Sequence, residues 1–240
     1  MKISEIKKTV HFYKAIDELN LTKKLPKPLH ITNMEAPLTE EQVKYHFALI
    51  DSHTSDIVAD PQNALKRFSR GMDFYLVQDF DSSIADFTKS ILLDGNFFPA
   101  YFMRALVRFK QLEYKKAEAL SDTNSSSAGD GKQETGVTGV DYEVVKKDLD
   151  KVIELAPDFV YGYYDRGNVF SALKDYRSAL EDYNKVIEMD PEFAEAYFNR
   201  GLTHIFLGNN KQGIMDLSKA GELGIVSAYN IIKRFTDIRE

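Results

Sequence analysis

The sequence predicts an all-α protein made of stacked helical pairs, and three observations lead to this fold class. Small residues recur with a period of about 34 residues, a length typical of repeat arrays in which each unit packs on its neighbours. Gly71 and Ala105 are one such period apart, and so are Gly167 and Gly201. An arginine precedes each of the four. The interval between the two pairs is nearly twice the period, and it contains a segment rich in serine, threonine and glycine.

The period divides residues 61–227 into four repeats. We place them at residues 64–97, 98–159, 160–193 and 194–227. The second repeat contains an insertion, expected at residues 113–140. More than half of the residues in 121–139 are Ser, Thr or Gly, a composition that buries too little apolar surface to offset the entropy lost on ordering.

Turn and breaker residues agree with these boundaries. The segments "LKDY" (173–176) and "LGNN" (207–210) separate the two helices of a pair, and Pro157 and Pro191 end the second helix of their repeats.

The segments that flank the array are predicted to be helical as well. Within residues 1–38, an amphipathic helix at 3–19 precedes a proline-containing linker. Residues 39–60 form the helix of a degenerate repeat, opened by the capping box Thr39–Gln42. Residues 228–240 form a C-terminal helix that caps the last repeat. The apolar stripe of the first helix consists of Ile3, Ile6, Val10, Tyr13 and Ile16.

Composition excludes several classes of function. The hydrophobic and charged shares, 43% and 28%, are ordinary for a globular protein of 240 residues. A net charge of −6 argues against a nucleic-acid groove, which requires an excess of Lys and Arg. Cysteine is absent, so disulfides and thiolate metal sites are excluded. We expect no metal and no cofactor.

The sequence also bears on localisation and oligomeric state. Residues 1–20 lack the apolar segment of a signal peptide, and no run of about 18 apolar residues could span a membrane. We therefore expect a cytoplasmic protein as the chain stands. If the chain were a fragment of a longer secreted protein, the periplasm or cell envelope would be its place. The oligomeric state stays open.

The repeats are similar to a known family. Counted from the first residue of each repeat, a small residue stands at position 8 and an apolar residue at position 24. Most copies also have a small residue at position 20 and an aromatic residue at position 17. In the third repeat these four residues are Gly167, Tyr183, Ala179 and Tyr176. This pattern resembles the tetratricopeptide repeat in an array of the bacterial type, over roughly residues 60–227. The sequence departs from the family at position 4, where the family's tryptophan is Tyr or Arg. The resemblance implies a right-handed superhelical solenoid of helix–turn–helix units.

A basic and an acidic residue recur inside every repeat. Position 7 is arginine and position 23 is aspartate in all four copies, with the insertion between them in the second copy. In an antiparallel hairpin that turns near position 15, both positions lie about 12 Å from the turn. We expect a partly buried ion pair in each repeat. The four pairs are Arg70–Asp86, Arg104–Asp148, Arg166–Asp182 and Arg200–Asp216.

The resemblance also implies where a ligand would bind. In tetratricopeptide arrays the first helices line a concave groove, which here would be apolar and aromatic, a composition typical of interface anchors. The alternative is that these side chains pack between neighbouring repeats or under the N-terminal segment. The family's carboxylate clamp for chaperone tails is matched only at Asn168 and Asn199, so that function is not expected. The predicted groove residues are Phe68, Met72, Tyr75, Phe102, Leu106, Phe109, Tyr161, Tyr164, Asn168, Phe198, Leu202 and Ile205.

Other candidate chemistry is weak. The segment "AGDGKQETG" lacks the first glycine and the final Ser or Thr of a phosphate-binding loop. His46 and His53 share a helix face with Asp51 near by, but two turns separate the histidines, which is too far for shared metal ligation. His204 is expected to pack in a hairpin interior. No catalytic constellation stands out, so we expect no enzyme activity.

The sequence leaves three functions open. The leading one is a non-catalytic scaffold that binds a peptide or helix of a protein partner in the groove. The second is a self-associating structural module, in which the array or residues 1–38 pack on another copy. The third is an accessory domain of a larger assembly.

Overall fold

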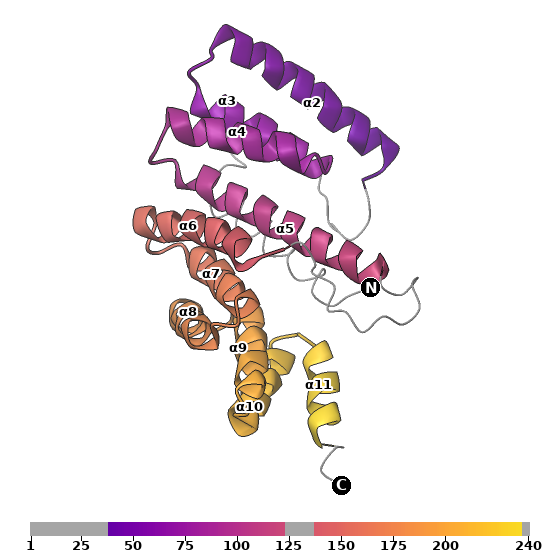
Figure 1. Cartoon of the computed structure of the whole chain (residues 1–240), viewed down its shortest axis with the longest axis vertical. Coiled ribbons are helices and arrows are strands. Elements are labelled where there is room, and N and C mark those ends of the chain that lie inside the picture. The colour runs from indigo at the N-terminus through magenta and orange to yellow at the C-terminus, as the bar shows by residue number, and fades with distance from the viewer. Residues whose placement is uncertain (1–37, 123–136, 237–240) are drawn as a thin grey trace. The chain divides into compact units, whose positions relative to one another are not determined.

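The computed structural model describes residues 38–122 and 137–236, and every element in these residues is a helix (Figure 1). The described residues divide into two compact units, one within Ala36–Ala156 and one within Pro157–Glu240. The predicted N-terminal helix, most of its linker and the centre of the predicted insertion lie outside the described residues.

The first unit is a series of five helices, each packed on the next (Figure 1). The centre of the predicted insertion lies between the fourth and fifth helices of this series. The helices are α2 (Glu40–Ala59), α3 (Ala64–Leu76), α4 (Phe80–Leu93), α5 (Phe98–Asp122) and α6 (Gly139–Leu155).

The predicted capping box opens α2. The Thr39 hydroxyl oxygen accepts a hydrogen bond from the Gln42 backbone N–H, and the Gln42 side-chain oxygen accepts one from the Thr39 N–H at 2.8 Å.

The second unit contains two complete hairpins and a terminal helix, again with each helix on the next. Ala228 of the terminal helix is fully buried against Phe198, Leu217 and Ala220, where a following repeat would otherwise pack. The helices are α7 (Val160–Ala172), α8 (Tyr176–Met189), α9 (Ala194–Phe206), α10 (Asn210–Glu222) and α11 (Ser227–Thr236).

The turn inside a hairpin has the same geometry in three repeats. The residue at position 15 has a positive φ: 65° at Gln78, 62° at Lys174 and 80° at Gly208. At the first turn, the Asp79 N–H donates to the Phe74 carbonyl and the Gln78 N–H to the Tyr75 carbonyl, which defines a Schellman end to α3. The hairpins therefore turn at the position that the ion-pair argument assumed.

Small residues at position 8 are required by the close approach of the two helices. A Cβ added at Gly167 would lie 2.8 Å from Cε1 of the Tyr183 ring, and one at Gly71 would lie 2.9 Å from Cε1 of Phe87. Both rings are buried at position 24 of the facing helix. The core of each of these hairpins is thus an aromatic ring seated on a glycine backbone.

The first part of the predicted insertion is helical. Helix α5 continues to Asp122, so the expected boundary at residue 113 falls inside the helix. The residues that follow, "EYKKAEAL", are nearly all strong helix formers, which explains the extension. The added turns also contact the fold, because Tyr114 stacks on Phe80 and Glu113 accepts a hydrogen bond from Tyr142 at 3.3 Å.

Candidate functional site

All four arginine–aspartate pairs are present in the structure. Each guanidinium donates through Nε to one carboxylate oxygen and through Nη2 to the other, at distances between 2.6 and 2.9 Å. The aspartates are buried and the arginines half-buried. The hydrogen bond to Asp86, followed by its charge, raises the pKa of Arg70 despite its burial.

Three of these arginines also reach back to the preceding helix. The Nη1 group of Arg70 donates to Thr54 at 3.0 Å, and that of Arg104 donates to Thr88 at 3.1 Å. In the second unit, Arg200 Nη1 donates to Asn184 at 2.7 Å. Each acceptor precedes its arginine by 16 residues. In the repeats without an insertion, the aspartate follows the arginine by the same number of residues. One guanidinium therefore links three helices, which is a structural role.

Further arginines that sequence reasoning missed join the pairs of the first unit. Arg108 Nη1 donates to Asp148 at 2.8 Å, and Arg67 lies 3.5 Å from Asp86. Arg108 follows Arg104 by one helical turn, and Arg67 precedes Arg70 by about one turn, so helical spacing alone could have indicated both.

The two histidines of α2 meet a carboxylate from α3. His46 Nδ1 lies 2.9 Å from Asp73 Oδ1, and His53 Nε2 lies 3.3 Å from Asp73 Oδ2. His46 and Asp73 are buried, His53 is half-buried and Asp51 is exposed. The histidines thus have a structural role, although the sequence did not single out Asp73. Within residues 38–122 and 137–236, no group of His, Asp or Glu is arranged to hold a metal ion.

The predicted aromatic groove is mostly core. Seven of its residues are buried, so they cannot offer a contact surface as predicted. Phe68, for example, packs against the rings of Phe87 and Phe97, with centroids 5.3 and 5.2 Å away. These two rings cover Phe68, which is fully buried. The buried residues are Phe68, Met72, Tyr75, Phe102, Tyr161, Tyr164 and Phe198.

The other five predicted groove residues are half-buried. They come from the first helices α5, α7 and α9. Leu202 and Ile205, three residues apart on α9, also pack against the core of the second unit. The half-buried residues are Leu106, Phe109, Asn168, Leu202 and Ile205.

An amide cluster joins α7 and α9 in the second unit. The Asn199 side-chain amide donates to the Tyr164 hydroxyl at 2.9 Å and to Asn168 Oδ1 at 2.8 Å. The Tyr183 hydroxyl donates to the same Asn168 oxygen at 2.9 Å. The two asparagines that the sequence noted are therefore in direct contact, and a buried tyrosine from α8 supports them.

Carboxylates border this cluster. Asp165 Oδ1 lies 3.4 Å from Asn168 Nδ2, and Glu195 lies in the first turn of α9. Burial raises the pKa of Tyr164 well above its usual value, and the charges of Glu195 and Asp165 add to the effect. The Tyr164 hydroxyl consequently stays protonated. We call Asp165, Asn168, Glu195, Asn199, Leu202 and Ile205 the α7–α9 face.

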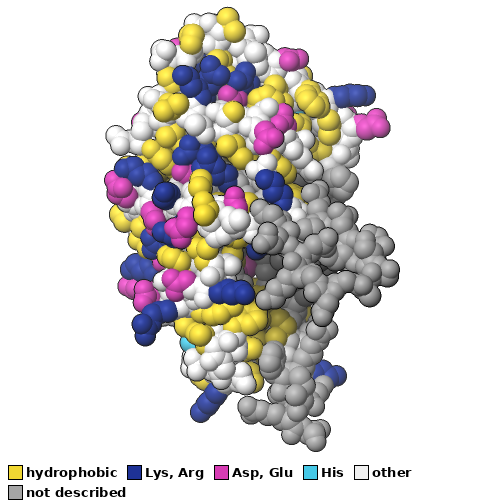
Figure 2. Space-filling model, in the orientation of Figure 1, with side chains coloured by type: hydrophobic (Ala, Val, Ile, Leu, Met, Phe, Trp, Pro, Cys, Tyr) yellow, Lys and Arg dark blue, Asp and Glu magenta, His cyan; other side chains and the backbone are white. Residues whose placement is uncertain are grey.

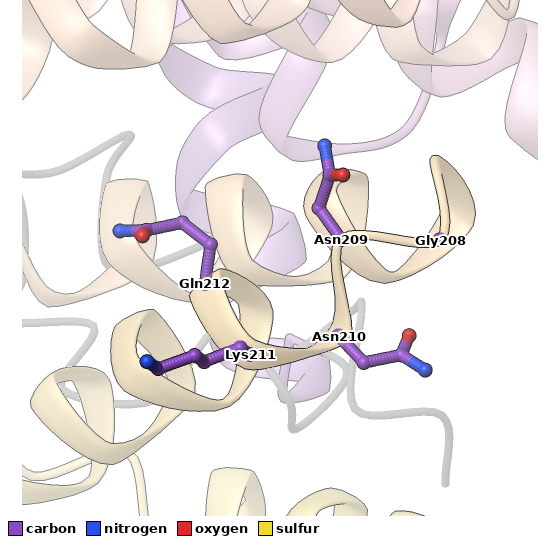
Figure 3. A pocket seen from close by; sticks show the side chains of 5 residues that line it. All are labelled: Gly208, Asn209, Asn210, Lys211 and Gln212. Atoms are coloured by element: carbon purple, nitrogen blue, oxygen red, sulfur yellow. The ribbon is translucent and has the colours of Figure 1, made fainter.

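A surface depression at the turn between α9 and α10 is a weaker candidate. It is lined by Gly208 and the four residues that follow it, and their side chains point in different directions (Figure 3). A small-molecule site needs polar groups that converge on the ligand, and these side chains do not converge.

On the face in view in Figure 2, charges of both signs are interspersed among hydrophobic side chains in the part of the chain that is described. No described helix is long and apolar enough to cross a membrane.

Comparisons with known proteins agree with this architecture. A family model described as TPR repeat matches residues 167–208, and one described as tetratricopeptide repeat matches residues 194–223. Curated proteins gave no significant match. The chain is thus a helical repeat protein. The two models together match residues 167–223 of the second unit, and over these residues the resemblance to tetratricopeptide repeats is confirmed.

Solved structures with this fold include several of MamA. One crystal structure of MamA is 20% identical over 75% of this chain and 89% of that chain, with a TM-score of 0.58. MamA 41-end from Desulfovibrio magneticus RS-1 is 16% identical over 91% and 96%, also with 0.58. MamA MSR-1 C2 is 13% identical over 79% and 99%, with 0.52. At these identities the similarity establishes the fold alone.

Proposed function

We propose that this chain is a non-catalytic protein-interaction module whose α7–α9 face binds a peptide segment of a protein partner. The observation that carries the proposal is the Asn168–Asn199 contact, which places two amide side chains from neighbouring first helices side by side. The recurring arginines and aspartates hold helices together in every repeat, which argues against a catalytic role for them.

The hydrogen bonds of Asn199 leave it able to read a peptide backbone. Both N–H groups of its amide are engaged, by Tyr164 and Asn168, whereas its carbonyl oxygen accepts no hydrogen bond from the described residues. That oxygen can accept from a peptide N–H. Asn168 donates to Asp165 over a long contact of 3.4 Å, which it can exchange for a peptide carbonyl. Such a pair recognises main chain rather than one side chain.

Leu202 supplies the apolar part of the face. It follows Asn199 by three residues on α9, so the two side chains share a side of that helix. A half-buried leucine beside an amide pair suits a ligand with one apolar side chain next to the backbone groups that Asn199 reads. The bordering carboxylates favour ligands with basic rather than acidic side chains.

The test is peptide selection followed by measured affinity. Peptides selected from a random displayed library on the full chain are assayed by fluorescence anisotropy against the unmodified chain, Asn199→Ala and the control Asn230→Ala. Asn230 is an exposed asparagine on α11. Loss of one hydrogen bond of about 1 kcal/mol predicts roughly fivefold weaker binding to Asn199→Ala alone. Equal affinities for all three proteins would place the ligand elsewhere.

A further inference from the structure

We infer that the second unit has another docking surface, at the turns between α7 and α8 and between α9 and α10. Its occupant is an acidic segment of a protein partner that carries an aromatic side chain. We call this the hairpin-tip surface. It shares no residue with the α7–α9 face and does not depend on the function proposed for that face. It consists of Lys174, Tyr176, Arg177, Phe206, Leu207 and Lys211.

The apolar centre of the hairpin-tip surface is an aromatic stack that is open to solvent. The rings of Tyr176, at the start of α8, and Phe206, at the end of α9, stack with centroids 5.8 Å apart and an angle of 16° between their planes. Phe206 is 66% exposed and the neighbouring Leu207 is 45% exposed. An aromatic side chain of a partner can bury this area against the outer side of the stack.

The equivalent ring of the first unit is covered by the chain itself. Phe80 stands at position 17 of its repeat, as Tyr176 does, and stacks on Tyr114 with centroids 5.8 Å apart. The Lys110 ammonium lies 5.8 Å from the centre of the same Phe80 ring. Lys110 occupies position 13, where the second unit has Phe206. Among the described residues, no cation lies over the rings of Tyr176 and Phe206.

Three cationic side chains flank the stack. Lys174 and Arg177 lie within two residues of Tyr176, so their Cα atoms are within about 7 Å of its Cα atom. Lys211 follows Phe206 by five residues, and its side chain extends from the first turn of α10 (Figure 3). All three cations are exposed, and no acidic side chain in the described part of the chain forms an ion pair with them.

The nearest carboxylate in the chain is already engaged. Asp175 caps α8 and accepts hydrogen bonds from the backbone N–H of Ser178 at 3.3 Å and from its hydroxyl at 2.7 Å. Farther along α8 and α10, by contrast, Lys185 and Lys219 each pair with a glutamate one turn away. The cations of the hairpin-tip surface are therefore available to carboxylates of a partner.

The fold does not require cations at these positions. In the first repeat, Gln78 stands at the position of Lys174, and Asp81 at that of Arg177. Both are exposed, as their counterparts are. The same hairpin turn thus forms with neutral and acidic side chains, so the positive charge of the second unit is a property of its surface. Charge complementarity selects an acidic partner.

Charge also favours an acidic peptide over an anionic membrane. The whole chain has a net charge of −6, which opposes its approach to a wide anionic surface. A short peptide responds mainly to charges within about 8 to 10 Å, because salt screens those farther away. The three cations can therefore attract a short acidic segment to the exposed stack even though the chain as a whole is anionic.

NMR titration of the full chain tests the surface with a defined probe. The probe is the peptide Glu-Glu-Phe-Glu-Glu with blocked ends, and the comparison peptides are Glu-Glu-Ser-Glu-Glu and Lys-Lys-Phe-Lys-Lys. We expect the probe to shift the backbone amide signals of Arg177 and Leu207 saturably, and at lower concentration than either comparison peptide. Raising the salt from about 0.05 to 0.3 M should weaken its binding, since exposed charges are screened.

Matched variants separate the contribution of the charges from that of the ring. Arg177→Glu with Lys211→Glu reverses two cations of the surface, and the control pair Lys185→Glu with Lys219→Glu makes the same change of charge on the same two helices. The first pair should weaken binding of the probe about tenfold, and the control pair by less than about twofold. Phe206→Ala removes an exposed ring and should weaken binding about fivefold.

The same measurements give the results that would overturn the inference. Equal binding of the probe to the two charge-reversed proteins would do so, and so would equal binding of the three peptides or shifts confined to the α7–α9 face. Sedimentation with phosphatidylserine vesicles is the last comparison. Vesicle binding that Arg177→Glu with Lys211→Glu abolishes, without binding of the probe, would assign the surface to a membrane and overturn a protein partner. The proposed function is tested separately, by Asn199→Ala.

Discussion

Arg104 and Asp148 lie 44 residues apart in the chain, yet their side chains form the same two-pronged ion pair as partners only 16 residues apart. Arg104 Nη2 lies 2.6 Å from Asp148 Oδ1, and Nε lies 2.9 Å from Oδ2. The insertion that separates them enters at the tip of the hairpin between α5 and α6. The entropy of closing a loop grows only slowly with its length, so the hairpin geometry survives the insertion.

Breaking one such pair should destabilise the protein strongly. In Asp182→Asn, the Arg166 guanidinium keeps its half-buried position but loses the charge of its carboxylate partner, whose side chain is 7% exposed. Removing one partner of a buried pair typically costs about 3 to 5 kcal/mol. We expect a clearly lower midpoint in chemical unfolding. The control is Asp158→Asn, an exposed aspartate in the same unit, and equal midpoints for the two variants would contradict a structural role for the pair.

The glycine at position 8 should not tolerate even one methyl group. In Gly167→Ala, the new Cβ would lie 2.8 Å from the Tyr183 ring, which is fully buried and has little freedom to move. Overpacking of this kind typically costs about 1 to 3 kcal/mol, which exceeds the usual gain of up to about 1 kcal/mol from replacing a helical glycine. The measurement is the free energy of unfolding in urea.

The matched control for this substitution is Gly95→Ala. A Cβ at Gly95 would meet no atom within 4 Å, and its φ is not positive, so alanine should be neutral or slightly stabilising there. If Gly167→Ala were as stable as Gly95→Ala, the two helices of the hairpin could move apart without a decrease in the free energy of unfolding.

His204 should make stability depend on pH. Burial lowers the pKa of His204 below 6.5, and Arg200 adds to this while Asp216 opposes it. The Nδ1 atom is buried, and no residue in the described part of the chain forms a hydrogen bond with it. Because the unfolded imidazole binds a proton more readily than the folded one, the histidine's contribution is fully present above pH 6.5 and decreases as the pH falls through that value.

The test for His204 compares pH profiles rather than single values. The unfolding free energies of the unmodified chain and His204→Asn are measured between pH 5 and 8, and their difference should change below about pH 6.5. A difference that stays constant across this range would show that the imidazole takes up protons equally in both states.

Much of the architecture could be predicted from the sequence because it depends on linear spacing. The repeat period located the hairpins, and the constant offset between Arg200 and Asp216 and their counterparts identified the pairs before any coordinates. Turn residues such as Gly208 marked the ends of helices. In a hairpin of two regular helices, the position of a residue in the chain determines its distance from the turn and the side of the helix on which its side chain lies. These contacts can therefore be predicted from the sequence.

The candidate site was predicted only in part. Asn168 and Asn199 were noted from the family resemblance, but their contact, and the tyrosines that support them, depend on how α7, α8 and α9 approach one another. Four aromatic residues of the first helices were expected in a groove, and the structure buries them: Phe68, Phe102, Tyr164 and Phe198. Helical spacing shows which way a side chain points, but it does not show how closely the next helix covers it.

By itself the sequence determined the repeat period and the internal ion pairs, since these follow from a regular spacing and from residue types that helices require. Only the tertiary structure decided that Phe68 is core, that Asp73 joins His46 to His53, and that two amides meet between α7 and α9. These outcomes depend on the distance between helices, which is set by packing volume summed over many side chains rather than by any local pattern.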